Sequence, residues 1–236
     1  MIRMRPLALA ALASLSLLAG CSGFIDKPQR PVLFDMGPLA PLSAQAPRTD
    51  PRIPVVLPDI EASGALDGTP VLYRLAYSDD HQLRAYAQSR WSAPPPQLVR
   101  QRLREQLGRE GPVLSVDESA AIDRRSVGGV YLLRLELEEF AQVFDTPERS
   151  RGVIRLRATL FAPSASGEQL LGQRSIAVEG SAPTADASGG VRALSAATDA
   201  AAADISAWLR QVRGARRAIP PTPKTRHDSS RAWRPG

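Results

Sequence analysis

Two neighbouring stretches, 130–143 (VYLLRLELEEFAQV) and 151–161 (RGVIRLRATLF), decide the fold that this sequence predicts. In the first, Leu133, Leu135 and Leu137 alternate with charged residues, and the second stretch repeats the period of two. This alternation is typical of strands with one buried face. Glutamates dominate the polar positions of the first stretch and arginines those of the second, which suits antiparallel neighbours. We therefore expect a sheet whose polar face is either solvated, with cross-strand ion pairs, or covered by a partner.

Two helices are predicted by apolar residues at helical spacing. The first, residues 97–108, follows Pro94-Pro95-Pro96, because proline is tolerated in the first turn of a helix. The second, residues 186–212, is rich in alanine, and the pair Gly189-Gly190 moves its expected start toward Val191. The apolar stripe of the first helix consists of Leu98, Val99, Leu103 and Leu107.

Shorter apolar runs, bounded by proline, glycine or acidic residues, predict further strands. They are expected at residues 32–37, 53–57, 71–77, 82–87, 113–116 and 170–178, with a turn at Asp79-Asp80. Together with the two long strands and the two helices, these elements predict an α+β fold. We expect a mixed, mainly antiparallel sheet with two helices packed on one face.

The N-terminal segment carries a targeting signal. Arg3 and Arg5 precede a short apolar run that ends in Leu18-Ala19-Gly20-Cys21. These are the parts of a secretory signal peptide, and the run is too short to span a bilayer. With cysteine in last place, the segment resembles a bacterial lipobox, which implies cleavage before Cys21 and lipidation of that residue. Ser22-Gly23 follows, without an aspartate for inner-membrane retention, so resemblance to proteobacterial lipoproteins implies the inner leaflet of the outer membrane.

The charge of the chain is distributed unevenly. The formal net charge is +6, and residues 213–236 alone hold seven Lys or Arg and one Asp. The basic character therefore describes a tail and not a nucleic-acid-binding domain. We divide the chain into a signal peptide (1–20), a tether (21–31), one domain (32–212) and a basic, Pro-rich, disordered tail (213–236). Cys21 is the only cysteine, so no disulfide can form within the chain.

The sequence offers little that could catalyse a reaction. It has two histidines, of which His227 lies in the basic tail and His81 follows Asp79-Asp80. Those three neighbours could ligate a metal, but we interpret them as a solvated turn. We find no Gly-rich phosphate loop, no Gly-x-Ser-x-Gly motif and no Cys-His pairing. We expect a protein that is not an enzyme and that holds no cofactor and no metal.

Three segments in a fixed order carry a resemblance to a known family. They are Phe34-Asp35-Met36-Gly37-Pro38; Leu72-Tyr73-Arg74, followed by Ala87 to Pro94 and a helix ending in Glu105-Gln106-Leu107-Gly108; and the strand Tyr131 to Phe140 with an Ala-rich helix ending near Trp208. Because these segments follow a lipobox-like sequence in this order, the chain resembles the ABC-type transport auxiliary lipoproteins. The resemblance covers residues 21–212 and leaves the basic tail outside.

The resemblance implies a role rather than a reaction. Such lipoproteins are non-catalytic auxiliary subunits of transport systems that pair an ABC ATPase and permease with an MCE-domain protein, and their cargo is lipid or another apolar molecule. The implied partners are the MCE-domain protein and the membrane, the latter through lipidated Cys21; self-association stays open, and nucleic acid is excluded. The alternative is a stand-alone periplasmic lipoprotein that binds cell-wall polymer or anionic lipid through its basic tail.

Arg74, Arg90 and Trp91 are the candidate partner-docking residues. Trp and Arg are common among the residues that dominate binding energy at interfaces. The alternative is structural: Trp91 would seal the first helix onto the sheet, and the arginines would pair with nearby carboxylates.

Overall fold

A computed structural model describes residues 30–38, 54–120, 130–164 and 167–218 of the chain. Its nine-stranded sheet consists of β1 (Val32–Phe34), β2 (Val55–Val56), β3 (Glu61–Ala62), β4 (Pro70–Leu75), β5 (Asp79–Trp91), β6 (Val113–Leu114), β7 (Tyr131–Thr146), β8 (Arg149–Ser164) and β9 (Gly167–Ser181). The helices are α2 (Pro95–Gly108), α3 (Val116–Ala120) and α4 (Ala187–Ala218), with a short 3-10 helix, η2 (Gly64–Leu66). None of the described helices is both long and apolar enough to cross a membrane.

Strand β7 is the centre of the sheet. On one edge it pairs with β8 in an antiparallel register, and β8 continues to β9, which completes the expected three-stranded meander. The other edge is shared by β2, β3 and β4, which pair in parallel with successive segments of β7. Strand β5 returns antiparallel to β4, and β1 pairs in parallel with the end of β5. The sheet is therefore mixed, as predicted, and its long pairings are antiparallel.

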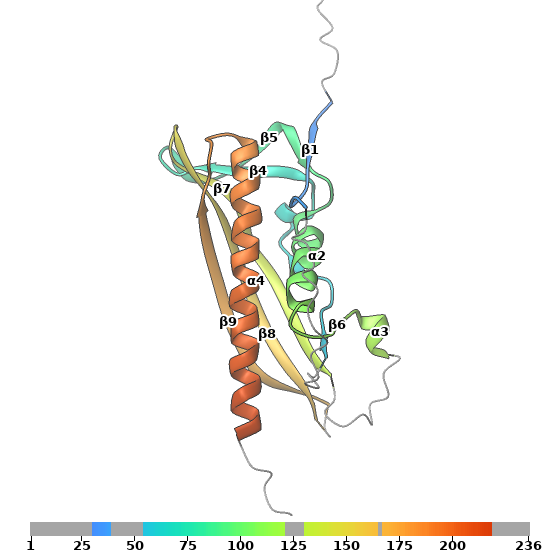
Figure 1. The fold of residues 1–236 in the computed structure, drawn as a ribbon. Helices are drawn as coiled ribbons and strands as arrows, with labels where there is room; N and C mark the ends of the chain where they lie inside the picture. The colour runs from blue at the N-terminus through green and yellow to red at the C-terminus, as the bar shows by residue number, and fades with distance from the viewer. Residues whose placement is uncertain (1–29, 39–53, 121–129, 165–166, 219–236) are drawn as a thin grey trace, which may run out of the picture.

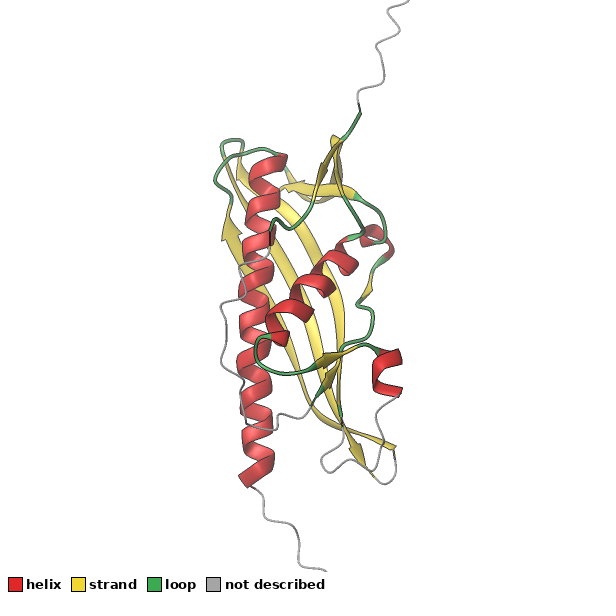
Figure 2. Cartoon of the chain, turned by 45° about the vertical axis from the view of Figure 1, so that its right-hand side comes forward, coloured by secondary structure: helices red, strands yellow, loops and turns green. Residues whose placement is uncertain are grey.

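Helices α2 and α4 lie side by side on the same face of the sheet, and α4 runs along the length of the meander (Figures 1 and 2). The predicted α+β class, with two helices on one face, is confirmed. The stripe predicted for α2 is buried as expected: Leu98, Val99, Leu103 and Leu107.

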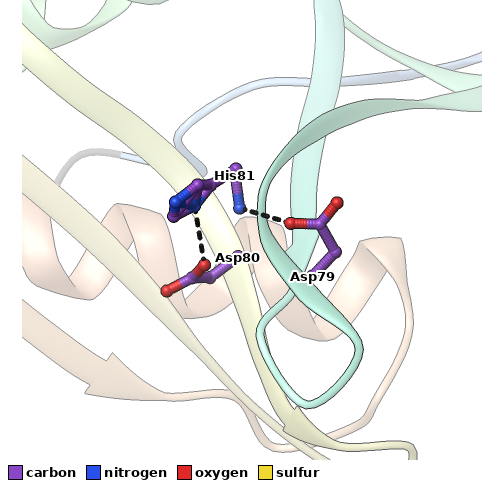
Figure 3. A group of neighbouring side chains, drawn as sticks. All are labelled: Asp79, Asp80 and His81. Carbon is purple, nitrogen blue, oxygen red and sulfur yellow. Dashed lines mark hydrogen bonds and ion pairs between the residues drawn. The ribbon is translucent and has the colours of Figure 1, made fainter.

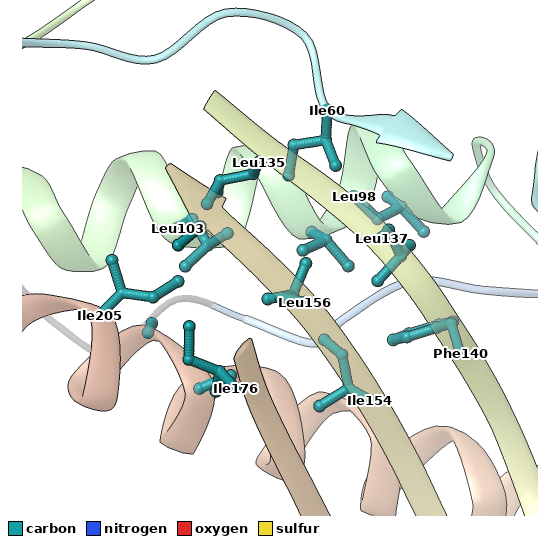
Figure 4. Close-up of a cluster of buried hydrophobic side chains, with 14 of the residues drawn as sticks. Ile60, Leu98, Leu103, Leu135, Leu137, Phe140, Ile154, Leu156, Ile176 and Ile205 are labelled. Atoms are coloured by element: carbon teal, nitrogen blue, oxygen red, sulfur yellow. The ribbon is translucent and has the colours of Figure 1, made fainter. Parts of the chain in front are cut away.

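The core fills the space between the helices and the apolar faces of β7, β8 and β9 (Figure 4). Leu133 and Leu137 of β7 and Leu156 of β8 are fully buried at 0% exposure, and Leu135 is 3% exposed. Ile205 of α4 meets these side chains from the helix layer. The faces assigned from the alternation are therefore correct.

The other face of the meander carries the expected rows of charge. Glu136 of β7 lies opposite Arg157 of β8, with Arg157 Nη1 at 3.3 Å from Glu136 Oε2. A β-bulge between Leu137 and Glu139 shifts the register, so that Glu139 lies opposite Arg155. The bulge keeps Phe140 on the buried face although it lies three positions after Leu137, an odd spacing that would place it on the opposite face of a regular strand. The ion pairs predicted across these strands thus form on the face without helices.

Helix α4 begins at Ala187 and not near Val191, because its two glycines serve close packing. A Cβ atom on Gly190 would lie 2.1 Å from Gln142 Oε1, and one on Gly189 would lie 2.0 Å from the carbonyl oxygen of Thr184. Asp186 caps the first turn, since its Oδ1 accepts a 2.8 Å hydrogen bond from Thr184 Oγ1 and a 2.7 Å bond from the Gly189 N–H. These two bonds, the Gly189 N–H bond above all, lower the pKa of Asp186.

Strand β8 approaches α4 equally closely at Gly152. A Cβ atom there would lie 2.6 Å from the backbone nitrogen of Leu194 and 2.7 Å from the carbonyl carbon of Ala193. Backbone atoms cannot move aside as a flexible side chain can. Gly152 and Gly190 therefore bring the first turns of α4 into direct contact with the sheet, while Gly189 allows the chain to pack closely on Thr184 in the preceding loop.

Several boundaries differ from those expected. The turn predicted at Asp79-Asp80 lies at residues 76–78, where the Ser78 N–H donates to the carbonyl of Leu75. Strand β5 then continues past 87, because β1 pairs with its last residues. The strands β2 and β6 are shorter than predicted, and β3 was not predicted. Helix α4 continues beyond 212 to Ala218, so the first residues assigned to a disordered tail are helical.

Helix α3 replaces the end of the strand predicted at 113–116. The Glu118 N–H donates to Ser115 Oγ at 3.2 Å, and the Ser115 N–H donates to Glu118 Oε2 at 2.6 Å. This reciprocal pair is a capping box, and its Ser-x-x-Glu spacing is visible in the sequence.

A bidentate ion pair joins the two long helices. Arg102 of α2 donates from Nε to Asp199 Oδ1 of α4 at 2.6 Å and from Nη2 to Oδ2 at 2.8 Å, and Gln106 Nε2 adds a third bond at 3.3 Å. The side chains are 11% and 35% exposed, so the pair is partly shielded from water. Burial alone would raise the pKa of Asp199, but the bonds from Arg102 and Gln106 outweigh it and lower that pKa below 3.8.

We predict that Leu135→Ala lowers the free energy of unfolding by about 2–5 kcal/mol, because it leaves a cavity in the centre of the core. Thermal or urea denaturation measures the loss. Ser175→Ala, at an exposed position of β9 in the same meander, is the control and should change stability by about 0.5 kcal/mol or less. An unchanged stability for Leu135→Ala would contradict the assignment of the two faces.

We also predict an acid-dependent loss of stability from the Arg102–Asp199 pair. Because the folded-state pKa of Asp199 is lowered, its contribution is fully present above pH 3.8 and is lost as the pH falls through the folded-state value. Asp199→Asn should therefore cost roughly 1–2 kcal/mol at pH 7 and less at pH 2. Asp204→Asn, an exposed position on the same helix, is the matched control. Equal losses at both pH values would contradict this account.

Candidate functional site

One end of the elongated molecule gathers β1, the β4–β5 hairpin, the β7–β8 turn and the first turns of α4 (Figure 1). The last turn of α4 lies at the opposite end. All the candidate docking residues, Arg74, Arg90 and Trp91, belong to the β4–β5 hairpin and therefore to the first end. Cys21, the predicted lipidation site, lies outside the described residues, as do the tether up to residue 29 and the tail from residue 219. We call the end that holds β1 and the β4–β5 hairpin the β1 end.

The segment Phe34-Asp35-Met36-Gly37-Pro38 forms the exit of β1. Asp35 Oδ1 accepts a 2.8 Å hydrogen bond from the Gly37 N–H, which closes a local turn. Gly37 has a φ of 76°, a conformation that a residue with a Cβ adopts only with strain. The turn directs Met36 into the core, where it is 7% exposed.

Trp91 is part of the core. It is 1% exposed, and its ring centroid lies 5.5 Å from that of Phe140 on β7. Its backbone N–H donates to the carbonyl of Thr69 at 2.6 Å, and Phe34 of β1 lies beside it in register. This environment fits the packing alternative for Trp91, which ties β1 and β5 to the central strand.

The two arginines are not brought together. Arg74 lies opposite Leu83 in the hairpin, whereas Arg90 lies opposite Pro70, four residues away along β4, about 13 Å at 3.3 Å per residue. Arg74 Nη1 donates to the carbonyl of Asp80 at 3.0 Å, and its Nε lies 3.9 Å from Glu139 Oε1. Arg90 Nη1 donates to the carbonyl of Tyr86 at 2.6 Å. The hairpin therefore presents two separate, half-buried guanidinium groups.

A buried polar network lies beneath the start of α4, and sequence reasoning missed it. Gln142 is 0% exposed; its Oε1 accepts a 2.8 Å hydrogen bond from the Tyr86 hydroxyl, and its Nε2 donates to Ser150 Oγ at 2.7 Å. Burial, with smaller effects from Tyr73 and Asp186, raises the pKa of Tyr86 to about 12. The network links the hairpin, β7 and β8 at the place where Gly190 packs on Gln142.

Asp79, Asp80 and His81 form a cluster of metal-ligand type at the start of β5 (Figure 3). All three are exposed, with His81 Nδ1 at 2.9 Å from Asp80 Oδ1 and the His81 N–H at 3.0 Å from Asp79 Oδ1. These contacts are local to three consecutive residues. We assign no metal to this cluster.

A pocket of about 420 Å³ lies between β1 and the first turns of α4, and we call it the β1–α4 pocket. Leu33, Phe34, Met36 and Val191 make its lining mostly apolar, while Asp35 and Arg192 contribute one charge of each sign. Sequence reasoning identified its β1 side as a family motif but not the pocket. Its two sides lie some 155 residues apart in the chain, and no periodic pattern connects them.

The arrangement of helices and sheet recurs in solved structures. A Xanthomonas campestris protein matches with a TM-score of 0.56 at 14% identity, over 71% of this chain and 88% of that chain. An uncharacterized protein of known structure matches with a TM-score of 0.55 at 17% identity, over 77% of this chain and 99% of that chain. At such identities the likeness concerns the fold alone. A search of the curated proteins gives no significant match.

The fold is thus that of an α+β module with two helices on one face of a sheet. Within this fold class, residues 35–206 match the model of the ABC-type transport auxiliary lipoprotein component. The match covers most of the chain, and the chain belongs to this family. The resemblance carried by the three sequence segments is confirmed, and the family associates the protein with an ABC-type transport system.

We predict that Tyr86→Phe lowers the free energy of unfolding by about 1–3 kcal/mol, because it leaves the buried Gln142 Oε1 without its donor. Chemical denaturation at pH 7 measures the effect. Tyr77→Phe removes the same hydroxyl from a residue that is 48% exposed, and it should leave the stability unchanged. Equal stabilities of the two variants would mean that the network contributes nothing to folding.

Proposed function

We propose that the protein is an outer-membrane lipoprotein on the periplasmic face and a non-catalytic auxiliary subunit of an MCE-type lipid transport system. The observation that carries the proposal is the family match over residues 35–206, which follows closely on Cys21 in a lipobox-like sequence. The family supplies the association with ABC-type transport. The anchor, the membrane and the MCE-domain partner are inferred from the sequence.

Lipidation of Cys21 would place the β1 end nearest to the membrane. Residues 22–31 separate the cysteine from β1, and a segment of this length spans at most ~35 Å when extended. One acyl chain holds a protein to a bilayer only reversibly, whereas several chains together give a stable anchor. Ser22-Gly23 after the cysteine supports the outer membrane as the destination.

The hairpin arginines are the proposed docking residues for the MCE-domain partner, or for a second copy of the chain. Arg74 and Arg90 are both half-buried, and arginine is common at interface hot spots. Trp91 contributes by holding the backbone of this corner, since its ring is buried. The energy for transport would come from the ATPase of the system, because the role proposed for this chain includes no reaction.

The experiment has two parts, of which the first tests the anchor. Cys21→Ala should give an unprocessed or soluble form, whereas Cys21 in the native chain should direct the protein to outer-membrane fractions. Membrane fractionation and mass spectrometry of the N-terminal peptide measure both. A Cys21→Ala variant that still needs detergent for release from outer membranes would contradict the proposed anchor.

The second part tests the partner. Affinity capture of the native lipoprotein from a detergent extract should recover an MCE-domain protein, and Arg74→Ala and Arg90→Ala should weaken this capture. Arg84→Ala, an alteration of the same kind on the same hairpin, is the control. Recovery of cell-wall fragments without any transporter component would support the stand-alone binding lipoprotein instead.

A further inference from the structure

We propose that the β1–α4 pocket binds one acyl chain and the headgroup of a zwitterionic phospholipid from the membrane that holds the protein. This inference rests on the proposed function, because it requires the β1 end to face the bilayer. It adds to that function a lipid site and the residues that form it.

The walls of the pocket suit a hydrocarbon chain. Met36 and Val191 form buried apolar surface at 7% and 6% exposure, and Phe34 is half-buried beside them. Leu33 lies on the pocket and is 68% exposed, the largest value among the exposed large apolar side chains of the described residues. A volume of about 420 Å³ with a mostly apolar lining falls in the range of small-ligand pockets. A bound chain would remove Leu33 from water.

The charges of the pocket suit the headgroup. Arg192 donates to the hydroxyl groups of Ser188 at 2.7 Å and Thr184 at 3.1 Å; the carboxylate of Asp186 interacts with it electrostatically but forms no ion pair with it within 4 Å. Its exposed guanidinium is a ready donor for a phosphate. Asp35 contributes a carboxylate, whose Oδ1 accepts from the Gly37 N–H. One cation and one anion on the same pocket match a headgroup that has both a phosphate and an amine.

The charges also distinguish a bilayer phospholipid from the acyl chains of the protein itself. The lipid expected on Cys21 is a diacylglycerol with a third acyl chain, and it has neither a phosphate nor an amine to pair with Arg192 and Asp35. The linker of residues 22–31 still keeps the pocket within reach of the bilayer, at most ~35 Å from the anchor. We therefore assign the pocket to a phospholipid and not to the anchor.

The test uses the mature chain of residues 21–236 with Cys21→Ser, which has no acyl chain of its own. The probe is a phosphatidylethanolamine with a photoreactive group in one acyl chain, incorporated in vesicles of phosphatidylethanolamine and phosphatidylglycerol. Labelled peptides are mapped by mass spectrometry after irradiation. We expect the label on residues 33–36 and 191–195, and a lower yield when the probe is a phosphatidylglycerol, which lacks the amine.

Paired variants test the two halves of the pocket. Leu33→Asp and Arg192→Glu should each reduce labelling about tenfold, as expected for a loss of 1.4 kcal/mol in binding. Leu170→Asp and Arg174→Glu make the same changes on exposed residues of β9, outside the pocket, and should leave the labelling unchanged. Thermal unfolding of all four variants verifies that they are folded.

Several outcomes would overturn the proposal. They are a label outside the pocket, equal labelling of the pocket and control variants, equal yields from the two lipid probes, or cross-links between copies that place a second chain over Leu33. Capture of the MCE-domain protein is measured separately on the native lipoprotein. Failed labelling with successful capture would reject the lipid site alone, and labelling without capture would reject the transporter role alone.

Discussion

The apolar face of β7 has to be buried along a strand of 16 residues, and the rest of the fold meets that requirement. No single neighbour supplies the partner for its whole length on the side away from β8. Three short strands share that edge in parallel. Helices α2 and α4 then cover the leucine face, and the Arg102–Asp199 pair joins them over it. A strand with long, regular alternation thus organises segments from most of the described chain.

Sequence reasoning predicted the features whose pattern extends over many consecutive residues. Leu133, Leu135 and Leu137 identified the buried face of β7, and the proline run identified the start of α2. Strands β2 and β6 were predicted, although longer than they are, whereas the two-residue strand β3 was missed because its position depends on the edge of β7 and not on an alternation of its own. The start of α4 was misjudged because a glycine pair has low helix propensity. In the fold the same pair permits contact with Thr184 and Gln142, and this contact outweighs the propensity.

In the candidate site, too, some residues could be recognised from the sequence, whereas their contacts could not. Asp35 to Pro38 and Arg90-Trp91 were visible as family segments, but their roles depend on partners distant in the chain. Trp91 packs on Phe140, and Met36 lies near Val191 in one pocket. Arg74 and Glu139 come from β4 and β7, which only the parallel pairing of those strands brings together. A partner that binds Arg74 would therefore compete with Glu139 for its guanidinium group.

Helix α4 also acts as a spacer of fixed length. A helix of 32 residues is about 48 Å long, and this one starts beside β1 and ends at the opposite end of the molecule. With the β1 end at the membrane, as proposed, the residues after Ala218 leave the domain several tens of ångströms above the bilayer. The last turns of α4, which include Arg210 and Arg213, then lie beyond the reach of electrostatic attraction by the lipid headgroups, which decays over about 8–10 Å at physiological salt. In the proposed orientation, the length of α4 thus separates the end of the domain that faces lipid from the end at which the helix stops.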